Sequence, residues 1–189
     1  MAGNIKQTMI KRTAVLLAKK GLQGASFSEI LEASGAPRGS LYHHFPGGKD
    51  ELVLAALEYA GGQALGVLNH LSGKPAREVA EGFLSLWRTV LARSDFSAGC
   101  AVVAVTVAAE SEALRARSAE ILREWRERLA MLFAESGMPR KKARAVAASL
   151  VAACEGAVIL ARAEKSFEPF DLVAAEQLVM IDGAAKSTS

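Results

Sequence analysis

The residues of this sequence that are best suited to chemistry lie close together, between positions 37 and 49. Arg38 and Ser40 fall at the start of a short predicted helix, where a guanidinium can donate two hydrogen bonds to the acceptor edge of a guanine. Tyr42 and His44 carry hydrogen-bonding tips that suit backbone phosphates. The segment therefore indicates a surface that reads nucleic acid.

The neighbouring residues support the same interpretation. Gly39 leaves room for a close approach, and Lys49 begins the next predicted helix, where its charge and the helix dipole both attract phosphate. Leu41 and Phe45 are four residues apart, so we expect both on the inward face of the helix. The predicted DNA-contacting set is Pro37, Arg38, Gly39, Ser40, Tyr42, His43, His44 and Lys49.

Other uses of this segment are less well supported. Adjacent histidines point about 100° apart on a helix, and no other His or Cys is near His43 and His44 in the sequence, which argues against a metal site. A phosphate-binding loop ending at Lys49 would need Gly at position 43 and Ser or Thr at position 50, where the chain has His43 and Asp50. An ordinary surface helix remains the plain alternative.

Local signals place this segment in a group of four helices. Ser26 and Glu29 have the spacing of a capping box, Gly35 is placed to end the helix that follows, and Pro37 suits the start of the next helix. The predicted helices cover residues 4–20, 26–34, 38–44 and 49–71. Two short helices around a tight turn form a helix-turn-helix layout, whose second helix can enter a major groove.

The remaining chain predicts longer helices and no strands. The sequence is 51% hydrophobic but only 6% aromatic, which argues against disorder and favours helices over a sheet. These helices are expected at residues 75–93, 98–110, 112–136, 139–165 and 169–182. The predicted fold is all-α, with a DNA-binding domain at residues 1–50 and a second helical domain at residues 51–189.

Charge is distributed unevenly along the 189 residues. Residues 1–49 carry seven basic and two acidic side chains, a net charge of +5, whereas residues 50–189 carry 16 basic and 18 acidic side chains, a net charge of −2. A small basic module suggests contact with a polyanion, although a solvated basic face would have the same composition.

Several other classes of protein are disfavoured. Cys100 and Cys154 lie far apart in apolar surroundings, which predicts buried free thiols and a reducing, cytoplasmic location. The apolar stretch at residues 143–161 contains Arg144 and Glu155, so we interpret it as a buried or inter-subunit helix rather than a membrane span. No Gly-x-Ser-x-Gly elbow, His-Glu-x-x-His helix, nucleotide loop or plausible Cys–His pair indicates an enzyme.

Residues 27–52 resemble the DNA-binding signature of TetR-family transcriptional regulators. The most specific part is Leu-Tyr-His-His-Phe at positions 41–45, followed by Lys49 and Leu52. One extra residue between Phe45 and Lys49 resembles the LmrA/YxaF-like branch of the family. The strong resemblance covers about residues 8–56.

The resemblance implies a homodimeric, all-helical repressor, and we expect no cofactor or metal. Residues 37–44 would enter the major groove of double-stranded operator DNA, and a small-molecule effector in the larger domain would change the spacing of the two reading helices. A helical protein-interaction module without sequence-specific DNA binding is the alternative function.

The sequence also suggests residues for the effector pocket and the dimer interface. The predicted effector pocket combines large or apolar residues with two carboxylates that lie within or beside apolar stretches. Its members are Phe83, Trp87, Phe96, Val103, Val107, Glu110, Trp125 and Glu155. By resemblance, the last two long helices of each subunit form a four-helix interface. Its predicted seam contains Ala147, Leu150, Val151, Cys154, Val158, Leu178 and Ile181, for which an ordinary core role is the alternative.

Overall fold

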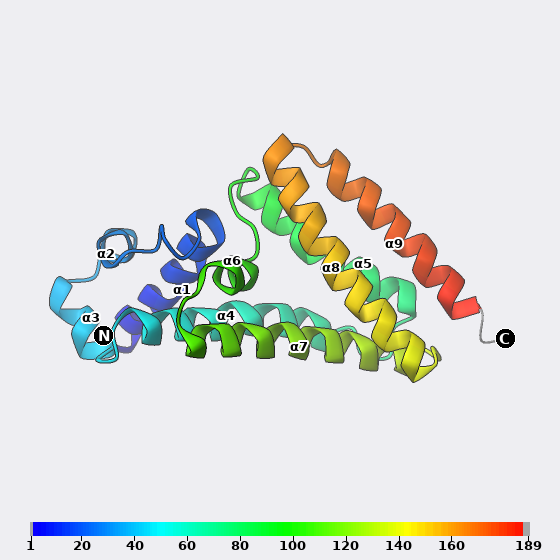
Figure 1. The fold of residues 1–189 in the computed structure, drawn as a ribbon, viewed down its shortest axis with the longest axis horizontal. Coiled ribbons are helices and arrows are strands. Elements are labelled where there is room, and N and C mark those ends of the chain that lie inside the picture. Colours follow the sequence, from blue (N-terminus) through cyan, green and yellow to red (C-terminus); the bar gives the residue numbers. More distant parts are fainter. Residues whose placement is uncertain (1, 187–189) are drawn as a thin grey trace. The chain divides into compact units, whose positions relative to one another are not determined.

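A computed structural model describes the backbone of residues 2–186 and the side chains of residues 5–185 (Figure 1). Over these residues the chain forms nine α-helices and no strands, which confirms the predicted all-α fold. Every predicted helix is present, with bounds that differ by four residues or fewer. The helices are α1 (Ala2–Lys20), α2 (Phe27–Ser34), α3 (Arg38–His44), α4 (Lys49–Asn69), α5 (Ala76–Arg93), α6 (Ala101–Ala108), α7 (Glu112–Glu135), α8 (Arg140–Glu164) and α9 (Glu168–Lys186).

Local capping explains where α2 begins and ends. Ser26 precedes the helix, and its Oγ accepts a hydrogen bond from the backbone N–H of Glu29 at 3.3 Å. The Glu29 carboxylate pairs with Lys20 Nζ at 2.7 Å, an ion pair that ties α2 to the end of α1. Gly35 ends the helix with a φ of 65°, a left-handed conformation that glycine adopts without steric cost.

The chain divides into two compact units. One unit contains the chain through residue 62 together with residues 100–121, and the other contains residues 63–99 and the chain from residue 122 onward. Leu52, Val53 and Leu57 on α4 are completely buried and contribute to the core of the first unit, while a functional division at residue 50 stays a prediction.

In the first unit, α1 packs against α2 and α6. Its core is apolar and fully enclosed, with Met9, Leu17, Ile30, Leu41 and Leu52 each at most 1% exposed. Gly61 on α4 has a packing role, since a Cβ at this position would lie 2.8 Å from Ile121 Cγ2. The absence of a side chain therefore lets α4 and the start of α7 approach each other.

In the second unit, α8 and α9 lie side by side and both pack against α5 (Figure 1). Arg88 on α5 donates two hydrogen bonds to Asp171 on α9, at 2.9 and 3.1 Å. The Arg88 guanidinium also lies 4.2 Å from the centre of the Phe167 ring. These contacts set the position of α9 relative to α5.

Two helices, α4 and α8, are long and apolar enough to cross a membrane by length and composition alone. In α8, half of the apolar window is buried inside the protein, a pattern that the core helix of a soluble protein also shows. Cys154 on this helix and Cys100 are both buried free thiols, as predicted. Burial and the neighbouring Glu155 charge raise the pKa of the Cys154 thiol well above its ordinary value.

Candidate nucleic-acid interface

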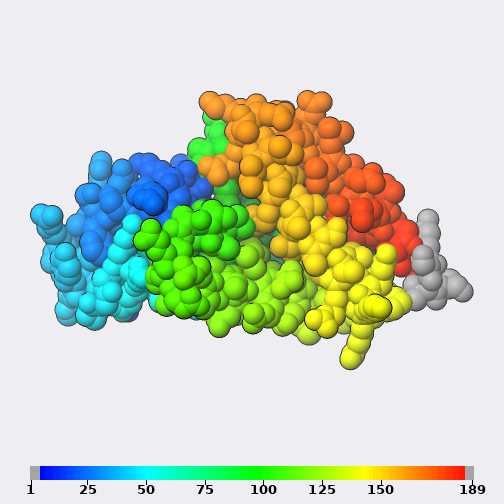
Figure 2. Space-filling model, in the orientation of Figure 1, coloured from blue at the N-terminus to red at the C-terminus, as the bar shows by residue number. Residues whose placement is uncertain are grey.

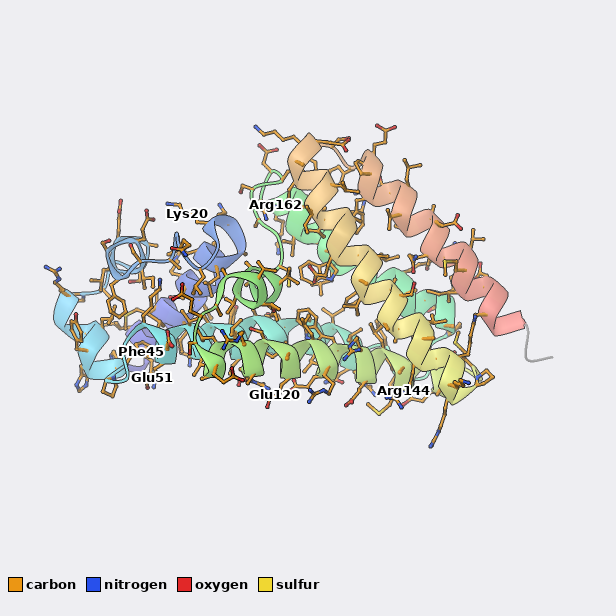
Figure 3. All side chains as sticks on the ribbon, viewed as in Figure 1. Lys20, Phe45, Glu51, Glu120, Arg144 and Arg162 are labelled. Atoms are coloured by element: carbon orange, nitrogen blue, oxygen red, sulfur yellow. The ribbon has the colours of Figure 1, made fainter. Side chains whose placement is uncertain are left out.

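Helix α3 has one buried face and one exposed face. Leu41 and Phe45 are each 1% exposed, which confirms their predicted inward orientation; Phe45 is labelled in Figure 3. On the other face, Arg38, Gly39 and His43 are exposed and Tyr42 is 63% exposed. The buried pair fixes the helix on its unit, and the remaining side chains are presented outward.

Arg38 makes no hydrogen bond or ion pair with any described residue. It borders a hollow of about 310 Å³ between α2 and α3 that Phe27 and Tyr42 also line. The Phe27 and Tyr42 rings meet edge to face, with centroids 6.1 Å apart. This ring contact restrains Tyr42 although most of its side chain is exposed, while the Arg38 guanidinium keeps all its donors available.

The first and last turns of α3 complete the predicted set. Pro37 precedes the first helical residue and offers no side-chain cap, and the Ser40 N–H donates to the Pro37 carbonyl at 2.9 Å. Ser40 and His44 are half-buried, and the His43 and His44 rings lie 4.9 Å apart. Among the described residues, no three or more side chains of His, Cys, Asp or Glu form a group that could hold a metal ion.

Lys49 has a structural contact that sequence reasoning missed. Its Nζ donates a 3.0 Å hydrogen bond to the carbonyl of Leu22, in the loop between α1 and α2. The two residues are 27 positions apart, so no local signal could reveal this bond. Lys49 therefore holds the start of α4 against the loop that precedes α2, and a phosphate contact by its remaining donors stays a prediction.

The turn between α3 and α4 is also held by side-chain contacts. The Gly47 N–H donates to the Glu51 carboxylate at 2.7 Å, and Glu51 is labelled at the start of α4 in Figure 3. Gly48 has a φ of 80°, a conformation that favours glycine. The extra residue in this turn is thus accommodated by a glycine pair and by Glu51.

Two lysines of α1 add positive charge to the same unit. Lys6 Nζ lies 5.4 Å from the centre of the Phe45 ring, and Lys11 Nζ lies 5.9 Å from that of Tyr59. Exposed lysines of this kind supply the sequence-independent attraction to phosphates on which nucleic-acid binding depends. The high basic content of residues 1–49 was the sequence signal for this charge.

Part of the predicted effector set comes together in the second unit. Phe83 and Trp87 on α5 meet edge to face at 6.4 Å, and Trp87 meets Trp125 on α7 at 6.0 Å. All three side chains are at most 5% exposed. Glu155 on α8 is also buried, at 9% exposure.

The other members of that set lie elsewhere. Phe96, in the loop after α5, packs against Phe167 at 4.7 Å and is half-buried. Val103 on α6 is half-buried, whereas Val107 is 79% exposed and Glu110 is exposed. Val107 and Glu110 therefore do not line an enclosed hollow within their own unit, because apolar patterning alone could not tell which side of so short a helix faces the core.

The predicted dimer seam lies on the inner side of α8 and α9. Leu178 is half-buried. The other six residues are buried within the chain itself: Ala147, Leu150, Val151, Cys154, Val158 and Ile181. The six buried side chains contribute to the core of the chain, and the role of the set in a dimer interface stays a prediction. The large apolar side chains that remain exposed on the two helices are Ile159, Leu160, Leu172, Val179 and Met180.

Comparison with known proteins extends these observations over most of the chain. Residues 9–56 match the family described as bacterial regulatory proteins, tetR family. Residues 75–176 match the family described as transcriptional regulator LmrA/YxaF-like, C-terminal domain. The two matches cover the helix-turn-helix and most of the helices that follow it.

Individual relatives agree with the family matches. An HTH-type transcriptional regulator of Mycobacterium tuberculosis is 34% identical over 175 residues, which is 89% of each chain. The HTH-type transcriptional regulator LmrA of Bacillus subtilis is 27% identical over 173 residues, 88% of this chain and 91% of LmrA. The crystal structure of a regulatory protein TetR from Rhodobacter sphaeroides is 27% identical, covers 91% of this chain and 96% of its own, and superposes with a TM-score of 0.81. The chain belongs to the TetR family of DNA-binding transcriptional regulators and is not an enzyme.

Proposed function

We propose that this chain is a homodimeric, cytoplasmic repressor that reads operator DNA through α3 and leaves it when a small molecule binds the second unit. The observation that carries the proposal is the exposed face of α3. Arg38 has no partner among the described residues, while Leu41 and Phe45 on the opposite face are buried. A helix seated in this way presents its hydrogen-bonding side chains to a major groove.

Within this proposal, the residues of α3 have different tasks. Arg38 reads a guanine, because its guanidinium can bond both acceptors of the major-groove edge. Tyr42 and His43, both exposed, contact phosphates and so set the register of the helix on the duplex. Gly39 is exposed and would meet no atom within 4 Å if it carried a Cβ, so its lack of a side chain suits a close approach of DNA.

The exposed side of α8 supports a two-fold dimer. Between Arg144 and Arg162 the only charged residue of this helix is Glu155, which is buried. The exposed residues of this stretch are small or aliphatic: Ala145, Ala152, Gly156, Ile159 and Leu160. A charge-free exposed face of this length suits contact with the same face of a second copy.

Gly156 strengthens the dimer proposal. Glycine within a helix costs roughly 1 kcal/mol relative to alanine. At Gly156 a Cβ would meet no atom within 4 Å, so packing within the chain does not account for this residue. Close approach of a second α8 across the two-fold axis would account for it, with Leu172 and Val179 of α9 at the sides.

Trp87 supports the binding of a small molecule in the second unit. Its side chain is 5% exposed, and its Nε1 is buried without a hydrogen-bond partner among the described residues. A buried N–H without a partner is energetically costly. An effector with an apolar body and a carbonyl, ether or ring-nitrogen acceptor would relieve that cost among Phe83, Trp87 and Trp125.

A gel-shift titration with DNA from upstream of the protein's own gene, or with a selected random-sequence pool, tests the DNA-reading step. We expect Arg38→Ala to weaken specific binding by about 1–3 kcal/mol and to relax discrimination at one base position. Arg93→Ala is the matched control, because Arg93 is exposed at the end of α5 and also has no partner among the described residues. If the two variants lose the same amount of DNA-binding affinity, Arg38 contributes only its positive charge and does not recognise a base.

The effector step has its own measurement. Trp87 and Trp125 are the only two tryptophans of the sequence and their rings are in contact, so intrinsic fluorescence reports directly on this cluster. A compound that releases the operator should change this fluorescence, and the change should be reduced in Trp87→Phe. A compound that releases DNA without affecting the tryptophans would place the effector elsewhere.

A further inference from the structure

The second unit carries a groove that the proposed function does not use. It lies between the last turns of α7 and the first turns of α8 and has a volume of about 930 Å³. Its floor is apolar, since Ala130 and Met138 are buried and Met131 is 51% exposed. A smaller hollow of about 170 Å³ shares Ala130 and Arg144 with it. Arg144 is labelled on α8 in Figure 3.

Four arginines surround these two hollows. Arg123 and Arg126 come from α7, and Arg140 and Arg144 come from α8. All four are exposed, and none makes a hydrogen bond or an ion pair with a described residue.

Other arginines of the same unit are paired. Arg77 lies against Glu81 and Asp182, Arg88 against Asp171. Arg93 of this unit also lacks a described partner, so the distinguishing feature of the groove is that four unpaired arginines gather around it.

Two carboxylates also line the hollows, and their negative charge offsets part of the positive charge of the arginines. The Glu135 carboxylate accepts a hydrogen bond from Ser72 at 3.1 Å and lies 3.7 Å from Arg128, so it is already engaged. Glu127 borders both hollows. Four guanidinium groups against these two carboxylates leave the rim of the groove positive.

The start of α8 adds to this positive potential. Its first turn contains no acidic residue, and Pro139 offers no side-chain cap. Acidic residues at this end stabilise a helix because they interact favourably with the positive end of its dipole. Here Lys141 and Lys142 follow Arg140 instead, so the potential from the side chains and the potential from the helix have the same sign.

We propose that this groove binds an amphiphilic anion, a small molecule with an apolar chain and a sulfate, phosphate or carboxylate head. The apolar chain of the ligand would cover Met131 and the apolar floor of the groove. The anionic head of the ligand would lie between Arg140 and Arg144. Methionine adapts to ligands of varied shape, and arginine pairs with oxyanions through two parallel donors. The volume falls within the range of small-molecule sites, and a concave groove bordered by arginines from two helices suits a single small molecule.

Methyl NMR of the full-length protein labelled at methionine tests this inference. The sequence has five methionines, and two of them, Met131 and Met138, line the groove. Met9 is buried in the core of the first unit and serves as an internal reference. Decyl sulfate, added below the concentration at which it forms micelles, should shift the Met131 and Met138 signals in a saturable way. Decyltrimethylammonium, with the same chain and the opposite charge, should not.

A matched pair of variants separates a specific head-group contact from general charge. Arg144→Gln should weaken the affinity for decyl sulfate about tenfold, as expected for the loss of a charge-assisted hydrogen bond. Arg93→Gln removes the same charge from the end of α5 and should leave the affinity unchanged.

Four results would overturn the proposal. The first is an equal response to the anion and the cation, and the second is an equal loss of affinity in both variants. The third is a shift of the Met131 and Met138 signals with protein concentration alone, which would mean that a second copy covers the groove. The fourth is a response to anionic phospholipid vesicles but not to monomeric decyl sulfate, which would indicate a lipid surface as the partner.

Discussion

Gly156 offers the most direct test of the proposed dimer, because the two possible surroundings of this residue predict opposite effects. If the exposed side of α8 faces water, Gly156→Leu improves helix propensity and raises the free energy of unfolding by about 1 kcal/mol. A Cβ at this position meets no atom from the other described parts of the chain within 4 Å, so its addition does not cause a clash that would offset that gain. If a second α8 crosses closely at Gly156, the same leucine separates the two helices.

The size of the effect follows from the symmetry of the dimer. Overpacking a close contact costs about 1–3 kcal/mol at each site. A two-fold interface carries the substitution twice, so the dimer loses about 2–6 kcal/mol. Even the lower value corresponds to a dissociation constant raised about 30-fold.

Sedimentation velocity over a range of protein concentrations measures the dissociation constant, and thermal unfolding of the same samples measures stability. Gly62→Leu is the matched control, since Gly62 is exposed within α4 and its Cβ position is equally open. We expect the control to remain dimeric while Gly156→Leu dissociates. The reasoning fails if Gly156→Leu keeps the wild-type dissociation constant and gains stability as the control does, because Gly156 would then face solvent in the assembly.

Three further predictions concern the first unit. Leu41→Ala should lower the free energy of unfolding by about 2–5 kcal/mol in chemical denaturation, because Leu41 is 1% exposed; a loss under about 1 kcal/mol would contradict its place in the core. Lys49→Ala should destabilise the unit through loss of the hydrogen bond to Leu22. It should also reduce, by about one, the slope of the logarithm of the DNA-binding constant against the logarithm of salt concentration. An unchanged slope would mean that Lys49 makes only the loop contact. Thr13→Val should raise the melting temperature, because the buried Thr13 hydroxyl has no hydrogen-bond partner among the described residues and valine keeps its shape; a lower melting temperature would reveal a partner for the hydroxyl.

Helix positions could be predicted from the sequence because local residues determine them. Ser26 caps α2, Gly35 ends it in a left-handed conformation, and Pro37 precedes α3. Each signal acts within a few residues of the boundary that it determines. The inward position of Leu41 and Phe45 follows in the same way from helical spacing.

The two faces of α8 could not be told apart by the same means. Both sides of this helix are apolar, so periodicity does not say which side packs in its own subunit. In the structure, Leu150, Val151 and Val158 fill the core, and small residues such as Ala152 and Gly156 stay outside. Side-chain size does not separate the two sides either, because Ala147 and Ala157 are buried whereas Ile159 and Leu160 are exposed.

The short length of α3 links the stability of the first unit to DNA reading. A helix of seven residues is marginal in water, so α3 depends on tertiary contacts for its structure. Leu41 and Phe45 supply those contacts, and the Lys49 bond to Leu22 holds the segment that follows. Substitutions at Leu41 and Phe45 should therefore reduce DNA affinity only as far as they unfold or displace α3, and stabilising conditions should restore it. Loss of affinity in Arg38→Ala should persist under the same conditions, because that side chain is exposed and the helix does not need it to fold.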